Sequence, residues 1–80
     1  MDIEILLFGI VADLIGENSI QFHLEEESTV SDFKKQLVLN YPQLKSYTTF
    51  AIAVNEEYAL DDKKIKHQDI IAIIPPVSGG

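Results

Sequence analysis

Residues 70–80 read IIAIIPPVSGG, and this stretch decides the fold that we predict. Residues 70–74 form an unbroken apolar run of mostly β-branched side chains, which is typical of a strand buried on both faces. Pro75 and Pro76 follow at once, and because proline fixes φ and cannot donate to a sheet ladder, the strand must end there. The sequence therefore predicts a domain over residues 1–74 and an extended, flexible tail over residues 75–80.

A second run, residues 3–8 (IEILLF), is also apolar on both faces apart from Glu4, so we expect it beside the last strand at the centre of a sheet. Residues 20–24 alternate between apolar and polar, as a half-buried strand does. A short helical turn over Val11–Ile15, closed by Gly16, is expected between these two strands. The expected strands are residues 3–8, 20–24, 50–54, 58–60 and 70–74.

One main helix is expected between the second and third strands. Thr29 is its N-cap, and Asp32 three residues later completes a capping box with Asp in place of Glu. Pro42 stops the helix near Asn40, and a further helical turn is expected at Leu44 and Tyr47. The predicted buried stripe of the helix comprises Val30, Phe33, Leu37, Val38 and Tyr41. This order of elements predicts an α+β fold of the β-grasp type, with a mixed sheet curled around one helix.

Composition restricts the function. The 80 residues hold thirteen acids, six lysines, no arginine and no cysteine. A nucleic-acid binder needs clustered cations, so that class is disfavoured, and a basic protein surface is the favoured partner. The apolar run at residues 5–12 follows Asp2 and Glu4 rather than basic residues, and no stretch is long enough to span a bilayer. We therefore expect a cytoplasmic protein without a membrane partner.

Ordinary side-chain catalysis has little support. His23 and His67 lack motif partners, so we expect two surface histidines, and the adjacent acids of residues 25–27 do not converge on one cation. No metal site is predicted. Gly79 and Gly80 could pass through a narrow channel and present the terminal carboxylate as the only reactive group. On the residues alone, a working terminus and a plain loose end remain equally good interpretations.

Four segments together resemble one family. "ILLFGIVADLIG", "TVSDFKKQL", "IAVNEEY" and the terminal "PPVSGG" are similar to the small subunits of molybdopterin synthase, which are ubiquitin-like sulfur carriers of the β-grasp fold. The terminal segment is the most specific of the four. The segment "KHQDI" departs from the family, because Gln68 stands where glycine is common.

The resemblance implies a function for the terminus. Gly80 would be adenylated by a ubiquitin-activating-like adenylyltransferase that uses ATP, and a sulfur donor protein would convert it to a thiocarboxylate. The tail would then enter the large subunit of molybdopterin synthase and give sulfur to a cyclic pterin phosphate precursor, in a heterotetramer of two carriers and two large subunits. The chain would bind no cofactor, and it would take part in the enzyme as a co-substrate rather than as a catalyst.

The resemblance also implies a docking surface. The partner would bind the tail through Pro75, Pro76, Val77, Ser78 and Gly79. Phe8, Leu60 and Ile74 are further candidates, although a place in the buried core explains Phe8 and Ile74 equally well. Three alternatives stay open: a carrier for thiamine or tRNA thiolation, a ubiquitin-like modifier joined to lysines, and an acidic interaction module with no chemistry at its end.

Overall fold

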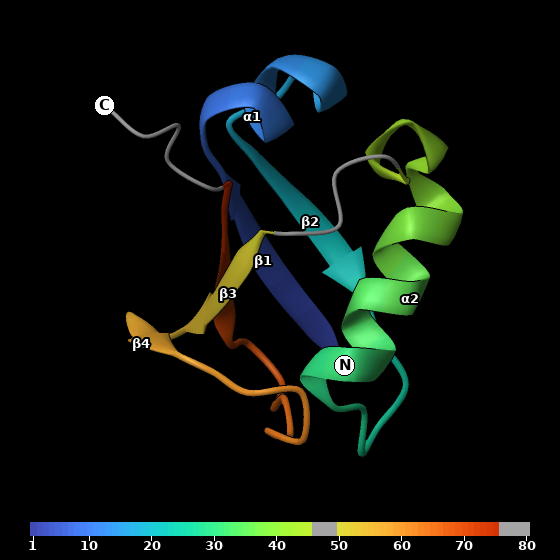
Figure 1. Ribbon diagram of the computed structural model, residues 1–80. Helices are drawn as coiled ribbons and strands as arrows, with labels where there is room; N and C mark the ends of the chain where they lie inside the picture. The colour runs from blue at the N-terminus through green and yellow to red at the C-terminus, as the bar shows by residue number, and fades with distance from the viewer. Residues whose placement is uncertain (46–49, 76–80) are drawn as a thin grey trace.

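The computed structural model describes residues 1–45 and 50–75. Its five strands form one mixed sheet in the order β2-β1-β5-β3-β4 (Figure 1). The central strands β1 and β5 run parallel, and every other neighbouring pair is antiparallel. The predicted central pairing of the first and last strands is thus confirmed. The strands are β1 (Asp2–Leu7), β2 (Ser19–His23), β3 (Ala51–Val54), β4 (Glu57–Tyr58) and β5 (Ile70–Ile74).

The main helix, α2 (Val30–Asn40), begins and ends where its sequence predicts. The Thr29 backbone N–H donates to Asp32 Oδ2 at 3.0 Å, and the Asp32 backbone N–H donates to Thr29 Oγ1 at 3.3 Å, which completes the capping box. A 3₁₀ turn, η1 (Pro42–Leu44), follows the helix. Tyr47, expected in that turn, lies outside the described residues.

A short helix, α1 (Gly9–Ile15), connects β1 to β2 and starts two residues earlier than predicted. It ends at Gly16, whose φ of 84° is a left-handed conformation that glycine adopts without strain. The helix lies at the end of the sheet from which β1 leaves (Figure 1). No helix in the described part of the chain is long and apolar enough to cross a membrane.

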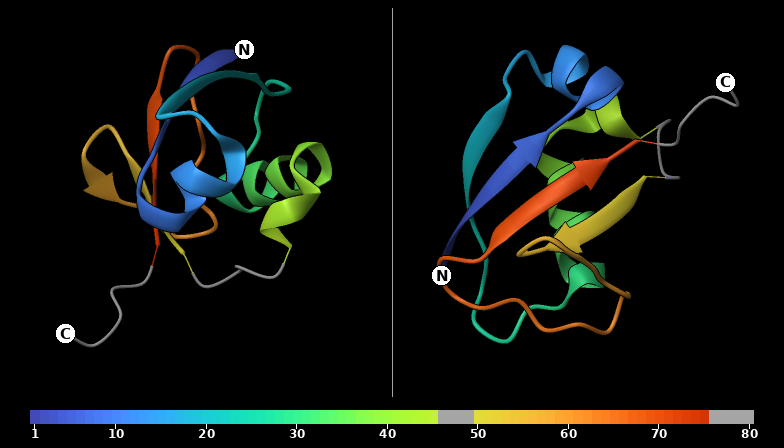
Figure 2. Two further views of the ribbon diagram at one scale, coloured as in Figure 1. Left: turned by 90° about the horizontal axis from the view of Figure 1, so that it is seen from above. Right: turned by 90° about the vertical axis from the view of Figure 1, so that its left-hand side faces the viewer.

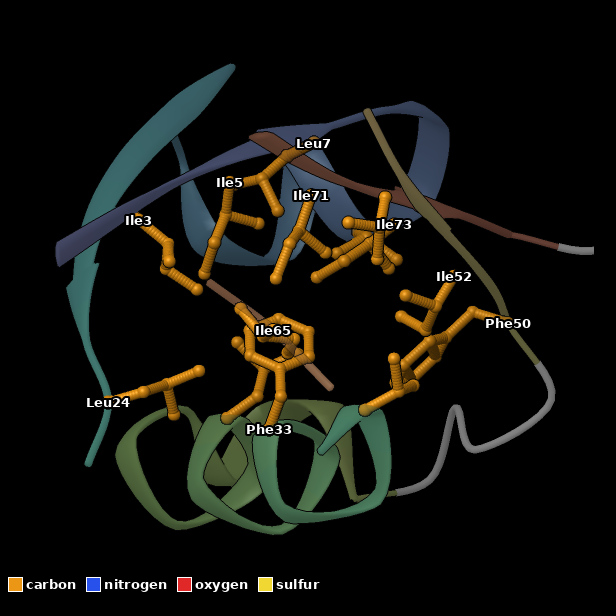
Figure 3. Close-up of a cluster of buried hydrophobic side chains, with 14 of the residues drawn as sticks. Ile3, Ile5, Leu7, Leu24, Phe33, Phe50, Ile52, Ile65, Ile71 and Ile73 are labelled. Carbon is orange, nitrogen blue, oxygen red and sulfur yellow. The ribbon is translucent and has the colours of Figure 1, made fainter. Parts of the chain in front are cut away.

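The core lies between α2 and one face of the sheet (Figure 3). Phe33 is fully buried at its centre and meets Phe22 edge-on, with ring centroids 5.8 Å apart. Val30 and Leu37 are buried as predicted, whereas Val38 and Tyr41 are only half-buried because they lie at the margins of the stripe. The sheet contributes Ile3, Ile5, Leu7, Ile52, Ile71 and Ile73 to the core.

The prediction that β1 and β5 are buried on both faces is wrong. Along β5, Ile71 and Ile73 are fully buried, but Ile70 is 43% exposed and Ile74 is half-buried. Leu6 of β1 is half-buried in the same way. The reason is that α2 covers one side of the sheet only (Figure 2). The second apolar face of the two central strands is therefore left open to solvent.

Candidate docking face and tail

The tail starts from a defined place on the molecule. β5 ends at Ile74, and Pro75 after it is half-buried. Because β1 and β5 are parallel and Leu7 pairs with Ile73, both strands end at the same edge of the sheet, with Phe8 beside Ile74. The predicted tail residues Pro76, Val77, Ser78, Gly79 and Gly80 lie outside the described residues, so their roles stay predictions.

Gly9 packs against the root of the tail. A Cβ atom built on Gly9 would lie 3.1 Å from Pro75 Cγ, which is tighter than an ordinary van der Waals contact. The φ of Gly9 is also 56°, in the left-handed region that favours glycine. This glycine therefore lets the start of α1 approach Pro75 closely, at the point where the chain leaves the sheet.

The uncovered side of the sheet, which we call the open face, is largely apolar, although Ala53 near its centre is only 6% exposed. The strand register places Leu6, Ala72, Ala53 and Tyr58 in one row across β1, β5, β3 and β4. The two alanines at its centre are short, whereas the leucine and tyrosine at its ends are large. The apolar residues of the open face are Leu6, Phe8, Ala51, Ala53, Tyr58, Ile70, Ala72 and Ile74.

Phe8 and Ile74 belong to this face rather than to the core. Phe8 is 49% exposed, Ile74 is half-buried, and both lie where the tail begins. Leu60 is 80% exposed, but it follows the edge strand β4, two strands away from Ile74. The structure thus brings two of the three predicted docking residues together and leaves the third apart.

Tyr58 and Ile70 were not predicted from the sequence as docking residues. Tyr58 is 77% exposed and Ile70 is 43% exposed, both on the open face. The sequence did contain a signal for this exposure. It predicts one long helix and five strands, and one helix can cover only one side of such a sheet, so the outward residues of the strands remain exposed.

The histidines lie on the surface, as predicted. His23 Nδ1 lies 3.0 Å from Asp2 Oδ1, and this hydrogen bond is the main cause that lowers the pKa of the Asp2 carboxyl. The Asp2 backbone N–H donates to His67 Nδ1 at 3.0 Å. Glu27 pairs with Lys64 at 2.7 Å, which lowers the pKa of the glutamate. Within the described ranges, no three metal-ligating side chains gather at one point.

Comparison with known proteins places the chain in a family. The model of the ThiS family matches residues 5–80, which is nearly the whole sequence. The chain belongs to the ThiS family. Curated relatives from several organisms bear the name molybdopterin synthase sulfur carrier subunit. The relative from Dictyostelium discoideum is 46% identical, over 96% of this chain and 94% of its own length. The relative from Arabidopsis thaliana is 36% identical, over 100% of this chain and 84% of its own length.

A solved structure confirms the fold. SAMP1, a small archaeal modifier protein from Haloferax volcanii, superposes with a TM-score of 0.88 at 28% identity, over the full length of both chains. The ThiS-family chain is therefore a ubiquitin-like β-grasp domain, as its order of elements predicts. The family match also extends over the PPVSGG terminus, of which the structure describes Pro75.

Proposed function

We propose that this chain is the sulfur-carrier small subunit of a molybdopterin synthase, acting in molybdenum cofactor biosynthesis. The observation that carries the proposal is the identity of 46% with the Dictyostelium sulfur carrier, spread over almost the whole of both chains. The terminal Gly79-Gly80, preceded by two prolines and two small residues, supplies the chemistry that such a carrier needs.

The chemistry belongs to the carboxylate of Gly80. A free carboxylate is a poor electrophile, so its oxygen first attacks the α-phosphorus of ATP on an adenylyltransferase and releases pyrophosphate. The acyl-adenylate that forms has AMP as a good leaving group. A donor protein supplies sulfur at the oxidation level of sulfide, as hydrosulfide, which attacks the carbonyl carbon, displaces AMP and leaves a thiocarboxylate. The chain has no cysteine, so no side-chain thiol can bind the sulfur, and the terminus carries it.

The open face supplies the docking surface in this proposal. Phe8 and Ile74 lie where the tail begins, so a partner that covers them also receives the tail. The partner is the large synthase subunit, which accepts the tail and binds the cyclic pterin phosphate precursor. With thirteen acids and no arginine, the carrier itself is poorly suited to hold a phosphorylated ligand.

A second candidate function is that of a protein modifier joined to lysines through Gly80. The likeness to SAMP1, which is named as a modifier, favours it. The two functions differ in partner, because a carrier forms a stoichiometric complex with a large synthase subunit, whereas a modifier appears as covalent adducts on many proteins. Purification of the tagged chain from its own cells, in denaturing and non-denaturing buffers, separates them.

The requirement for a free terminus is tested by adding one alanine after Gly80. The extended chain should fold as before and should give no molybdopterin when mixed with the activating enzyme, ATP, a sulfur donor, the large subunit and the precursor. The same alanine inserted in the exposed turn after Asp62 serves as the control for lengthening the chain. Normal product formation by the terminally extended chain would show that the terminus is not the reactive group.

A further inference from the structure

Glu4 is the one charged residue within the apolar rows of the open face. It lies on the central strand β1, where the register pairs it with Gln21 of β2 on one side and Ile70 of β5 on the other. Its side chain is half-buried, and Leu6 follows it two residues later on the same face. The other carboxylate of this face, Asp2, lies at the start of the strand and is engaged by His23.

The Glu4 carboxylate has no cationic partner among the described residues, where the three ion pairs are Asp2–His23, Lys34–Asp61 and Lys64–Glu27. None of the strands contains a lysine or an arginine. A hollow of about 320 Å³ adjoins the carboxylate and is bordered by Gln21, His67, Gln68 and Ile70. There is therefore room beside Glu4 for a side chain from another molecule.

A partner that covers the root of the tail will also reach Glu4. Phe8 lies four residues after Glu4, just beyond the end of β1, and four steps at the usual rise of an extended chain span about 13 Å. A stable interface buries about 800 Å² on each partner, a patch roughly 30 Å across. A standard interface that is centred on the open face near Phe8 and Ile74 therefore extends as far as Glu4.

Covering Glu4 removes water from its carboxylate, and an unpaired buried carboxylate is costly. A cation on the partner, placed against this carboxylate, offsets the lost hydration. It also fixes the relative position of the two surfaces, because a docking position that puts an anion or an uncharged group against Glu4 binds more weakly. The apolar rows alone do not fix where the partner docks, because one apolar contact can replace another when the partner shifts along the face.

We propose that the partner of the open face places a lysine or arginine side chain in the hollow beside Glu4, and that this ion pair selects the partner and sets the register of docking. The inference rests on the proposed function only in taking that partner to be the large synthase subunit. It assigns Glu4 a positioning role, at the opposite end of the open face from the tail.

The test compares Glu4→Gln with Glu26→Gln. Both substitutions remove one negative charge, but Glu26 is exposed in the loop after β2 and borders a hollow with Asp32 and Gln36 of α2, on the covered side of the sheet. Each variant is titrated with the large subunit from the same organism by calorimetry, at low and at high salt. Glu4→Gln should weaken binding tenfold or more and should flatten its salt dependence, whereas Glu26→Gln should stay within about twofold of wild type.

The outcomes separate the two proposals. Wild-type affinity of Glu4→Gln for a large subunit that binds the unmodified carrier would overturn the ion pair and leave the proposed function standing. Failure of the unmodified carrier to bind at all would overturn the proposed function and the ion pair with it. Unfolding in urea checks that both variants are folded, which we expect because Glu4 makes no ion pair within the described part of the carrier.

Discussion

Gln68 has a backbone conformation that suits glycine better than glutamine. Its φ is 69°, and its backbone N–H donates to the Asp2 carbonyl at 2.7 Å, which ties the turn to the start of β1. An L-residue in the left-handed region is strained by about 1–2 kcal/mol. Replacing it with glycine removes this strain, but part of the gain in stability is lost because glycine has more conformational freedom in the unfolded chain.

We predict that Gln68→Gly raises the free energy of unfolding by about 1 kcal/mol, because the hydrogen bond to Asp2 is kept and the strain is removed. Urea unfolding followed by circular dichroism measures the change. Gln21→Gly is the matched control, since Gln21 lies in strand β2 and its replacement should lower stability by about 0.5–1 kcal/mol. A loss of stability in Gln68→Gly would contradict the account.

The departure at Gln68 was visible in the sequence, but its backbone angle was not. The resemblance predicts a glycine at this position of the segment KHQDI, which singles out the residue without saying what its substitution costs. Asn55 and Glu56, with φ of 50° and 72°, form a left-handed pair in the turn before β4. Asn55 is a usual residue for such a turn and Glu56 is not, so only half of that turn could be read from residue type.

At the scale of elements, the start of α2 depends on the capping box. The Thr29 backbone N–H and hydroxyl both donate to Asp32, and these hydrogen bonds hold the pKa of its carboxyl below the ordinary range. Since the folded-state pKa is the lower one, the ionised carboxylate stabilises the helix fully above about pH 4. That stabilisation is lost as the pH falls through the lowered folded-state value.

We therefore predict that Asp32→Asn loses less stability than wild type on acidification from about pH 5 to about pH 2. Above this range the variant should be the less stable of the two, because the charged acceptor at the N-terminus of α2 is gone. Urea unfolding at a series of pH values measures both effects. Parallel pH profiles for the two proteins would show that the capping box does not depend on the charge of Asp32.

The elements themselves were largely predictable from local pattern. The capping box and Pro42 mark both ends of α2, and apolar alternation locates β2. The apolar runs of β1 and β5 did not establish that both faces of these strands are buried. An unbroken apolar run shows that both faces are apolar, but it does not show whether a face is covered by the same chain or open to a partner. Here the apolar excess of the central strands lies on the open face.

At the scale of the whole molecule, replacing an exposed apolar residue by serine should weaken binding to the large subunit on the open face but not on the helix side. We predict that Phe8→Ser weakens binding to the large subunit by tenfold or more, because Phe8 lies at the root of the tail and aromatic residues often dominate such interfaces. The matched control is Leu39→Ser, since Leu39 is 71% exposed on α2, which covers the other side of the sheet.

Calorimetric titration of both variants with the large subunit measures the difference, and urea unfolding checks that each is folded. The Leu39 variant should bind within about twofold of wild type. Equal weakening by the two substitutions would mean that the open face is not the docking surface.

The site as a whole was predicted unevenly. The residues of PPVSGG alone left a working terminus and a loose end equally good, and the resemblance to the sulfur carriers decided between them. The open face could not be predicted in detail, since its rows of side chains exist only once β1 and β5 pair in parallel and β3 joins them. Glu4 gains its significance in the same way, from neighbours that are 17 and 66 residues away in sequence.

Whether Gly80 carries sulfur is tested most directly by the intact mass of the carrier after reaction with its activating enzyme, ATP and a sulfur donor. We predict that one oxygen is replaced by sulfur, and that fragmentation places the change at Gly80. A chain lacking Gly80 should show no such change. An unchanged mass of the full-length chain, under conditions that convert the Dictyostelium relative, would contradict the claim that this domain carries sulfur on its terminus.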